Sequence, residues 1–204
     1  MLIKTLVVGP IETNCYVVTD EATLDCAVID PGDESNTILD YLEDNRLHCR
    51  AVMLTHAHFD HVGAVEAVLE ATGAKFYMCE RELETIRTRG SGAFKPPEGT
   101  VYYDDGDVVE AGSLRFEVIA TPGHTTGGVT LRCGDALFTG DTLFRGSCGR
   151  TDFPGGDMTT QLRSLRRLAQ LEGDFEVYPG HAECSTLSVE RAHNPYMRHA
   201  IEKL

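Results

Sequence analysis

The chain has 204 residues, of which 42% are hydrophobic and 25% charged, values that are ordinary for one globular domain. Its formal net charge of −14 argues against binding to nucleic acid or to an anionic membrane, both of which need a positive face. The seven cysteines form no C-x-x-C pair and the N-terminus lacks a signal-peptide pattern, so we expect a cytoplasmic protein with a single domain over residues 1–204.

The first half of the chain reads as strands followed by alternating helices and strands. Strands are expected at about 2–8, 15–19, 24–29, 51–55 and 75–79. Helices are expected after a cap at Ser35, over 63–72 and over 80–87. The segment 89–100 is rich in Gly and Pro, which predicts a mobile surface loop.

The second half repeats this style around a long glycine-rich loop. Strands are expected near 107–109, 114–120, 128–133, 136–140 and 175–178, with the loop over 143–157. An amphipathic helix follows the loop, with Leu162, Leu165, Leu168 and Leu171 on one stripe, and the C-terminus is helical with an interruption at Pro195. Clustered strands with helices between them predict two sheets packed face to face in a four-layer α/β/β/α sandwich. Periodicity alone leaves a single mixed sheet as the alternative.

The most informative segment is 55–63, which reads Thr-His-Ala-His-Phe-Asp-His-Val-Gly after an apolar run. Imidazole nitrogens and carboxylate oxygens are the ligands chosen by zinc, iron and manganese. Alternation of an extended chain places His56, His58 and Asp60 on one side, so they can converge. His61 points elsewhere and can serve a second ion. A polar loop of solvated histidines is the alternative, but this spacing favours a metal site.

Three further predicted strand ends are followed at once by residues of the same kinds. They are His124 after the run 116–123, Asp141 after 136–140 and His181 after 175–180. Each alone is a weak signal, since an aspartate can begin a turn and a histidine can end a strand. The set is strong, because the ends of such strands lie together at the edge of a sheet.

The candidate ligands predict a site for two divalent metal ions. They divide into two sets of three and a bridge: His56, His58 and His124; Asp60, His61 and His181; and Asp141 between them. Two ions about 3.5–4 Å apart can activate a bridging hydroxide and polarise a carbonyl group. We therefore expect a hydrolase, with zinc as the first expectation and iron or manganese as alternatives.

A His56-Ala-His58-Phe-Asp60-His61 motif is thus followed in the chain by His124, Asp141 and His181. This order resembles the metallo-β-lactamase superfamily over essentially the whole sequence. The resemblance implies an α/β/β/α sandwich with the metal site at one edge of the two sheets. It leaves the substrate open, because the superfamily includes lactamases, thioesterases, nucleases, lactonases and oxygenases.

The segment 139–156 narrows the choice of activity within this superfamily. It is similar to the corresponding loop of glyoxalase II, or hydroxyacylglutathione hydrolase, especially in its short bacterial form. Segments 13–16 and 30–32 also have close counterparts in that family. This resemblance implies hydrolysis of an S-acyl thiol such as S-lactoylglutathione, with attack of the bridging hydroxide on the thioester carbonyl. It also implies that Asp60, besides holding an ion, orients the nucleophile, which makes it the predicted catalytic residue.

Two arginines of the same segment are the predicted substrate-binding residues. Arg150 falls where glyoxalases use a basic residue for the carboxylate of the thiol, a contact that suits a guanidinium, and Arg145 is the alternative. A structural ion pair of Arg150 with Asp152 or Asp157 is the competing interpretation. The run Ala182-Glu183-Cys184 replaces the Gly-Pro that usually follows the last histidine, so another small thiol can stand in place of glutathione.

The main rival is a persulfide dioxygenase, since those enzymes share the fold and a similar loop and use one iron held by two histidines and an aspartate. Phe59 and the run 153–156 favour the short glyoxalases instead. A non-catalytic or nucleic-acid-processing member is less favoured, because all seven ligand positions are filled and the chain is acidic.

Overall fold

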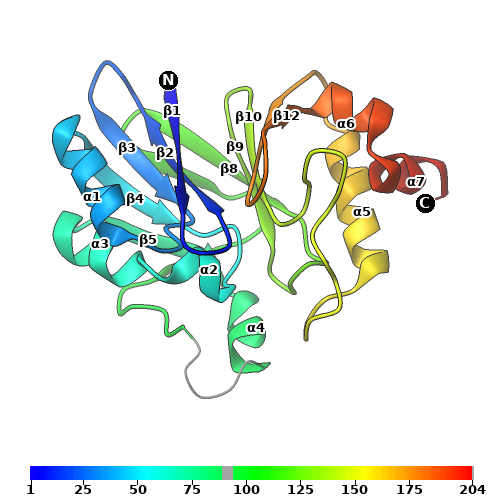
Figure 1. The fold of residues 1–204 in the computed structure, drawn as a ribbon, viewed down its shortest axis with the longest axis horizontal. Coiled ribbons are helices and arrows are strands. Elements are labelled where there is room, and N and C mark those ends of the chain that lie inside the picture. The colour runs from blue at the N-terminus through cyan, green and yellow to red at the C-terminus, as the bar shows by residue number, and fades with distance from the viewer. Residues whose placement is uncertain (89–93, 204) are drawn as a thin grey trace.

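A computed structural model describes residues 1–88 and 94–203 of the chain. Two mixed β-sheets pack face to face, and helices cover both outer surfaces (Figure 1). This arrangement confirms the predicted four-layer α/β/β/α sandwich. The loop predicted over 89–100 falls in part on residues 89–93, which lie outside the described residues. Within the described ranges, no helix is long and apolar enough to cross a membrane.

The first sheet is built from the N-terminal half, with its six strands side by side in chain order. The strands are β1 (Leu2–Val8), β2 (Thr13–Thr19), β3 (Asp25–Ile29), β4 (His48–Met53), β5 (Lys75–Cys79) and β6 (Val101–Tyr103). Pairing is antiparallel from β1 to β3 and parallel from β3 to β6. The segments after β3 and β4 therefore leave the sheet at the same edge.

The second sheet contains the six strands of the C-terminal half, again in chain order. They are β7 (Val108–Ala111), β8 (Leu114–Ala120), β9 (Val129–Cys133), β10 (Ala136–Gly140), β11 (Glu176–Pro179) and β12 (Ser185–Thr186). Neighbours are antiparallel except for β10 and β11, which run parallel. Strands β8, β10 and β11 consequently point in one direction, and the segments that follow them emerge together.

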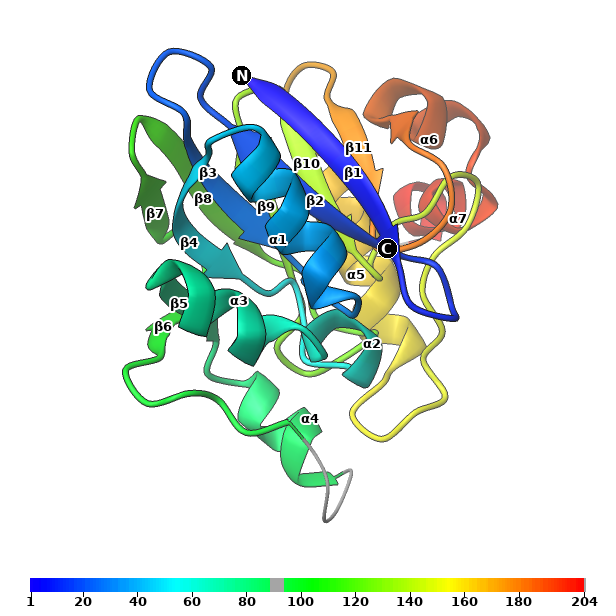
Figure 2. The same ribbon diagram turned by 60° about the vertical axis from the view of Figure 1, so that its left-hand side comes forward.

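Seven helices are assigned among the described residues. They are α1 (Ser35–Asp44), α2 (Phe59–Val62), α3 (Val65–Thr72), α4 (Glu82–Thr88), α5 (Met158–Ala169), α6 (Leu187–His193) and α7 (Pro195–Lys203). Helices α1 and α3 lie on the outer face of the first sheet, and α5, α6 and α7 lie on that of the second (Figures 1 and 2). Helix α5 begins where the Asp157 carboxylate accepts a hydrogen bond from the backbone N–H of Thr160 at 2.7 Å.

Apolar side chains from both sheets fill the space between them. Phe116 and Phe138 of the second sheet are fully buried there beside Met53 of the first. The rings of Tyr16 and Phe138 meet across the interface with their centroids 5.3 Å apart. This central layer fixes the two sheets against each other and so sets the positions of the segments at their edge.

Several local predictions were wrong in detail. Ser35 is the first helical residue of α1 and not its cap, because Glu34 before it takes a left-handed conformation with φ of 50° and makes no side-chain cap bond. The strand predicted at 51–55 is His48–Met53: it begins three residues earlier, where His48 pairs with Asp25, and a bend follows at Thr55. The short strands β6 and β12 were not predicted, because two or three residues carry no readable alternation.

Candidate metal centre

The predicted ligands come from the ends of four strands that meet at one edge of the sandwich. The segment after β4 carries His56 and His58 and continues into α2, whose four residues include Asp60 and His61. The second sheet supplies the other three, which are His124 after β8, Asp141 directly after β10 and His181 after β11. The structure therefore brings all seven predicted ligands to one place, with contributions from both halves of the chain.

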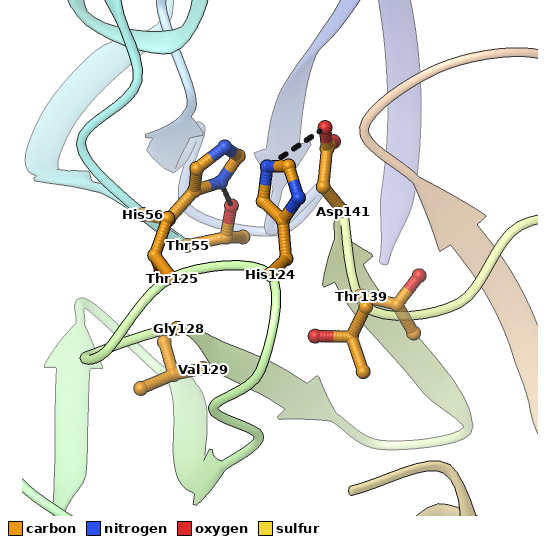
Figure 3. Close-up of a pocket in the computed structure, with 9 residues that line it drawn as sticks. Thr55, His56, His124, Thr125, Gly128, Val129, Thr139 and Asp141 are labelled. Carbon is orange, nitrogen blue, oxygen red and sulfur yellow. Dashed lines mark hydrogen bonds and ion pairs between the residues drawn. The ribbon is translucent and has the colours of Figure 1, made fainter. Parts of the chain in front are cut away.

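The first group of ligands consists of His56, His58 and His124. Their candidate ligand nitrogens all lie within 4.8 Å of one another, and all three side chains are buried. Nε2 of His124 is 2.8 Å from Nδ1 of His58. Figure 3 shows the rings of His56 and His124 side by side among the residues that line a small pocket. Three imidazoles gathered in this way suit zinc, iron or manganese.

The second group consists of Asp60, His61 and His181, whose ligand atoms also lie within 4.8 Å of one another. Oδ2 of Asp60 is 3.2 Å from Nε2 of His181 and 3.4 Å from Nε2 of His61. The Thr13 hydroxyl donates a hydrogen bond to the same Asp60 oxygen at 3.3 Å, which holds the carboxylate toward the histidines. These two sets have the members that the sequence predicted; a third set with equally close ligand atoms, Asp30, His56 and His61, was not predicted.

Asp141 lies between the two groups. Its Oδ2 is 3.3 Å from Nε2 of His124 in the first group and 3.7 Å from Nε2 of His181 in the second. Its Oδ1 is 3.5 Å from Nε2 of His61. Figure 3 shows the Asp141 carboxylate facing His124. A carboxylate whose Oδ2 lies near a histidine of each group has the placement that a bridging ligand needs.

Asp30 helps to orient His61 and His56 through their Nδ1 atoms, a role that was not predicted from the sequence. This buried carboxylate accepts hydrogen bonds from Nδ1 of His61 at 3.0 Å and from the Thr55 backbone and hydroxyl at 2.7 and 2.6 Å. The Thr55 hydroxyl in turn lies 3.1 Å from Nδ1 of His56. Protons on the Nδ1 atoms leave the Nε2 atoms of His56 and His61 as acceptors that face the centre. The sequence did contain a sign of this role, because Asp30 directly follows a buried strand, as Asp141 does.

Backbone contacts fix two more ligands. Nδ1 of His124 is 2.6 Å from the Arg150 carbonyl, which can only accept, so Nε2 of His124 faces the centre as an acceptor. The Asn14 amide donates to the carbonyls of Pro179 and Ala182, on either side of His181, at 3.0 and 2.9 Å. Asn14 thereby links the first sheet to the loop that carries His181.

Three buried polar atoms of the centre make no hydrogen bond within the described part of the chain: Nε2 of His56, Nε2 of His61 and Oδ1 of Asp141. Buried polar atoms are nearly always paired, so these orphaned atoms need a partner of another kind. A divalent cation at the first group would pair with His56, one at the second group would pair with His61, and Asp141 lies near both. The donor set and its orphaned atoms therefore fit metal ions.

The pKa shifts of the candidate ligands also favour positive charge at this centre. Burial lowers the pKa of His56 well below its ordinary value, and neighbouring histidines lower it further, so this imidazole is neutral. Burial alone would raise the pKa of Asp141, but the nearby His61, and then His124 and His181, hold it below its usual range. Burial also disfavours charge on His61, yet Asp30 and Asp141 raise its pKa above the ordinary value. Carboxylates that favour positive charge on His61 would equally favour a divalent cation beside it.

The two predicted substrate-binding arginines lie on the surface beside this centre. The guanidinium of Arg150 makes two hydrogen bonds to the Asp152 carboxylate, at 2.6 and 2.7 Å, and lies 4.0 Å from the centre of the Phe153 ring. That ring contacts the His58 ring edge-on, with centroids 5.9 Å apart. Arg145 pairs with Glu183. Both arginine side chains are more than half exposed and so are accessible to an anionic ligand.

Comparison with known sequences agrees with this geometry. Hydroxyacylglutathione hydrolase GloC of Haemophilus influenzae is 30% identical over an alignment that covers 97% of this chain and 98% of that protein. The similarity extends over nearly the full length of both proteins, so the metal centre and the loop around Arg150 fall within it.

Three solved structures share the fold at comparable identity. The B3 metallo-beta-lactamase BLEG-1 superposes with a TM-score of 0.86 at 32% identity, covering 96% of this chain and 99% of that one. ETHE1 from Myxococcus xanthus superposes with a TM-score of 0.83 at 30% sequence identity, covering 100% of this chain and 92% of that one. TTHA1623, solved in a di-iron-bound form, superposes with a TM-score of 0.82 at 37% sequence identity, covering 95% of this chain and 99% of that one.

The family itself follows from the sequence. The profile of the Metallo-beta-lactamase superfamily matches residues 8–181, a range that includes every predicted ligand from His56 to His181. With two facing sheets and seven histidine and aspartate side chains gathered at their common edge, this chain belongs to the metallo-beta-lactamase superfamily.

Proposed function

We propose that this protein is a two-metal hydrolase that cleaves S-acyl thiols, with S-lactoylglutathione as the representative substrate. The observation that carries the proposal is the division of seven ligands into two groups of three with Asp141 between them. Two divalent ions held there, zinc by expectation, would supply an activated water and Lewis acidity toward a carbonyl oxygen. The site needs no serine or cysteine nucleophile.

Asp60 serves as the catalytic carboxylate in this proposal. Burial opposes its charge, but hydrogen bonding to His181 and the charge of His61 hold its pKa below the usual range, so it is ionised at neutral pH. Its Oδ2 faces both histidines of the second group. An ionised carboxylate in this position can accept a proton from water and orient the water oxygen toward a substrate carbonyl.

The thiol half of the substrate is expected to bind at the two arginines. Arg150 and Arg145 each hold an exposed carboxylate of this same chain, Asp152 and Glu183 respectively. A substrate carboxylate can replace either partner with little loss, because exposed ion pairs contribute only about 0–1 kcal/mol. The likeness to the GloC hydrolase supports glutathione as the thiol. Another small carboxylated thiol would satisfy the same contacts.

The test is a spectrophotometric thioester assay on purified protein whose metal content has been quantified. We expect turnover of S-lactoylglutathione by the metal-loaded protein. Substitution of His56→Ala or Asp141→Ala should abolish turnover and lower metal content, whereas His199→Ala, at an exposed position on α7, should change neither. Full turnover by metal-free protein would contradict the proposal.

A persulfide dioxygenase is the second candidate, and it is supported by the similarity to ETHE1 over the whole chain. That activity consumes molecular oxygen and needs iron, whereas thioester hydrolysis needs neither. Oxygen uptake with a glutathione persulfide by iron-loaded protein, without thioester turnover, would favour this alternative. The two assays on the same metal-quantified preparation therefore separate the candidates.

A further inference from the structure

Glu82 is a buried carboxylate that belongs to neither ligand group. It is the first residue of α4, and its exposed fraction is 0%. Charged side chains are rarely buried to this extent unless their oxygens are fully bonded. The partners of Glu82 therefore indicate what it does.

Each carboxylate oxygen of Glu82 accepts a hydrogen bond from a different ligand-bearing loop. Oε2 accepts from the backbone N–H of Ala57, which lies between His56 and His58, at 2.8 Å. Oε1 accepts from the backbone N–H of Gly127, three residues after His124, also at 2.8 Å. One side chain thus connects the two loops that supply the three histidines of the first group.

The contact between α4 and the His124 loop is close along several residues. The Thr126 hydroxyl donates to the Arg81 carbonyl at 3.1 Å and lies 3.1 Å from the Thr85 hydroxyl. A Cβ atom on Gly127 would lie only 2.6 Å from the backbone nitrogen of Glu82. Glycine is therefore required at 127 for the loop to approach the helix closely enough for the Glu82 hydrogen bond.

Glu82 differs in its mode of action from Asp30. Asp30 contacts a ligand ring directly, through Nδ1 of His61, and so sets the orientation of that ring. Glu82 bonds to backbone amides, so it sets the distance between two loops. Burial raises the pKa of Glu82, and the Thr125 side chain together with the Ala57 and Gly127 amides opposes that rise, because these groups favour the charged form.

We propose that Glu82 is a positioning residue that fixes the spacing of His56 and His58 from His124 and thereby sets the metal affinity of the first group. The inference rests on the proposed two-metal site, but it concerns only one of the two ions. The second group of ligands is linked to Asp30, Thr13 and Asn14 and has no bond to Glu82 in the described structure.

The experiment titrates metal-free protein with Co²⁺ and follows visible absorption, with competition by a chelator to obtain each dissociation constant. The test variant is Glu82→Gln, which keeps the shape but turns an NH₂ group toward one of the two N–H donors. We expect one of the two ions to bind roughly tenfold or more weakly and the other to bind as in the wild type. The matched control is Glu84→Gln, an exposed glutamate of the same helix, which should change neither ion.

Two further backgrounds identify the affected ion. In Asp60→Asn protein the three-histidine group dominates binding, and Glu82→Gln should weaken the remaining strong ion. In His124→Ala protein the second group dominates, and Glu82→Gln should have no effect. Gly127→Ala is a second route to the same result, because its Cβ displaces the loop from α4 while Glu82 stays intact.

Equal weakening of both ions, or unchanged binding in both Glu82→Gln and Gly127→Ala, would overturn the proposal. If wild-type protein takes up only one ion, the two-metal site is wrong. The role of Glu82 is then decided on that single ion, by the ratio of its dissociation constants in the variant and the wild type. A variant that fails to fold is recognised by far-UV circular dichroism, and Gly127→Ala then gives the result.

Discussion

A methyl group at position 180 would test the placement of Asp141 more directly than removal of the aspartate. Gly180 follows the last residue of β11 and precedes His181, and its φ lies outside the left-handed region that favours glycine. Alanine can therefore adopt the backbone conformation. The added Cβ, however, would lie 2.3 Å from Oδ1 of Asp141 and 2.9 Å from Cε1 of His61.

The size of the effect follows from these distances. Ordinary contact between a Cβ and a neighbouring atom begins near 3.4 Å, so the Asp141 carboxylate has to move by about 1 Å. A displacement of that size at a reacting centre costs on the order of 100-fold in rate. For Gly180→Ala we expect a loss of that order in kcat/KM for the thioester. We also expect loss of at least one of the two ions, measured by elemental analysis after gel filtration.

The control is Gly173→Ala, in the segment before β11, where nothing lies within 4 Å of the added Cβ but φ is 97°. That variant should lose about 1 kcal/mol or more of stability through backbone strain and retain its metal and activity. Wild-type metal content and turnover in Gly180→Ala would refute the position assigned to Asp141. Metal loss in Gly173→Ala would show that the readout reports general destabilisation.

Three other predictions follow from the same structure. Asp30→Asn should lower the free energy of unfolding by about 1–3 kcal/mol in urea and weaken metal binding roughly 10–100-fold, because the amide cannot accept all three hydrogen bonds. A chelator should lower the melting temperature by about 5–11 °C if metal is present at 100 times its dissociation constant, and an unchanged melting temperature would argue against a bound ion. Leu165→Ala, under the second sheet, should cost about 2–5 kcal/mol in urea denaturation without a change in metal affinity, and a change in that affinity would contradict the separation of core and site.

The layered fold and the gathering of the ligands could be predicted because both depend on patterns that the chain repeats. Apolar runs mark the strands, and residues such as Asp141 directly follow those runs. Parallel strands then place the segments that follow them at the same edge of the sheet, and this does not depend on the exact first and last residue of each strand. The errors at Ser35 and at Met53 accordingly left the predicted site unchanged, since each shifts an element boundary by a few residues only.

The supporting carboxylates could not be predicted in the same way. Glu82 bonds to the backbone amides of Ala57 and Gly127, and an amide is present at almost every position of a sequence. No pattern of residue types therefore indicates which glutamate will be buried against them. For Arg150 the sequence left two interpretations, and the structure shows the pairing with Asp152 beside the predicted site.

The division of the two sheets between the two halves of the chain has a consequence for assembly. Each six-stranded sheet is contiguous in sequence, and the turn around Gly106 joins them. Each ligand group nevertheless takes members from both halves, with His124 completing the first and His181 the second. An ion bound by either group would therefore connect the two halves of the chain. Fragments produced by cutting the chain at Gly106 should therefore reassociate more tightly when metal is present, and removal of the metal should weaken their association again.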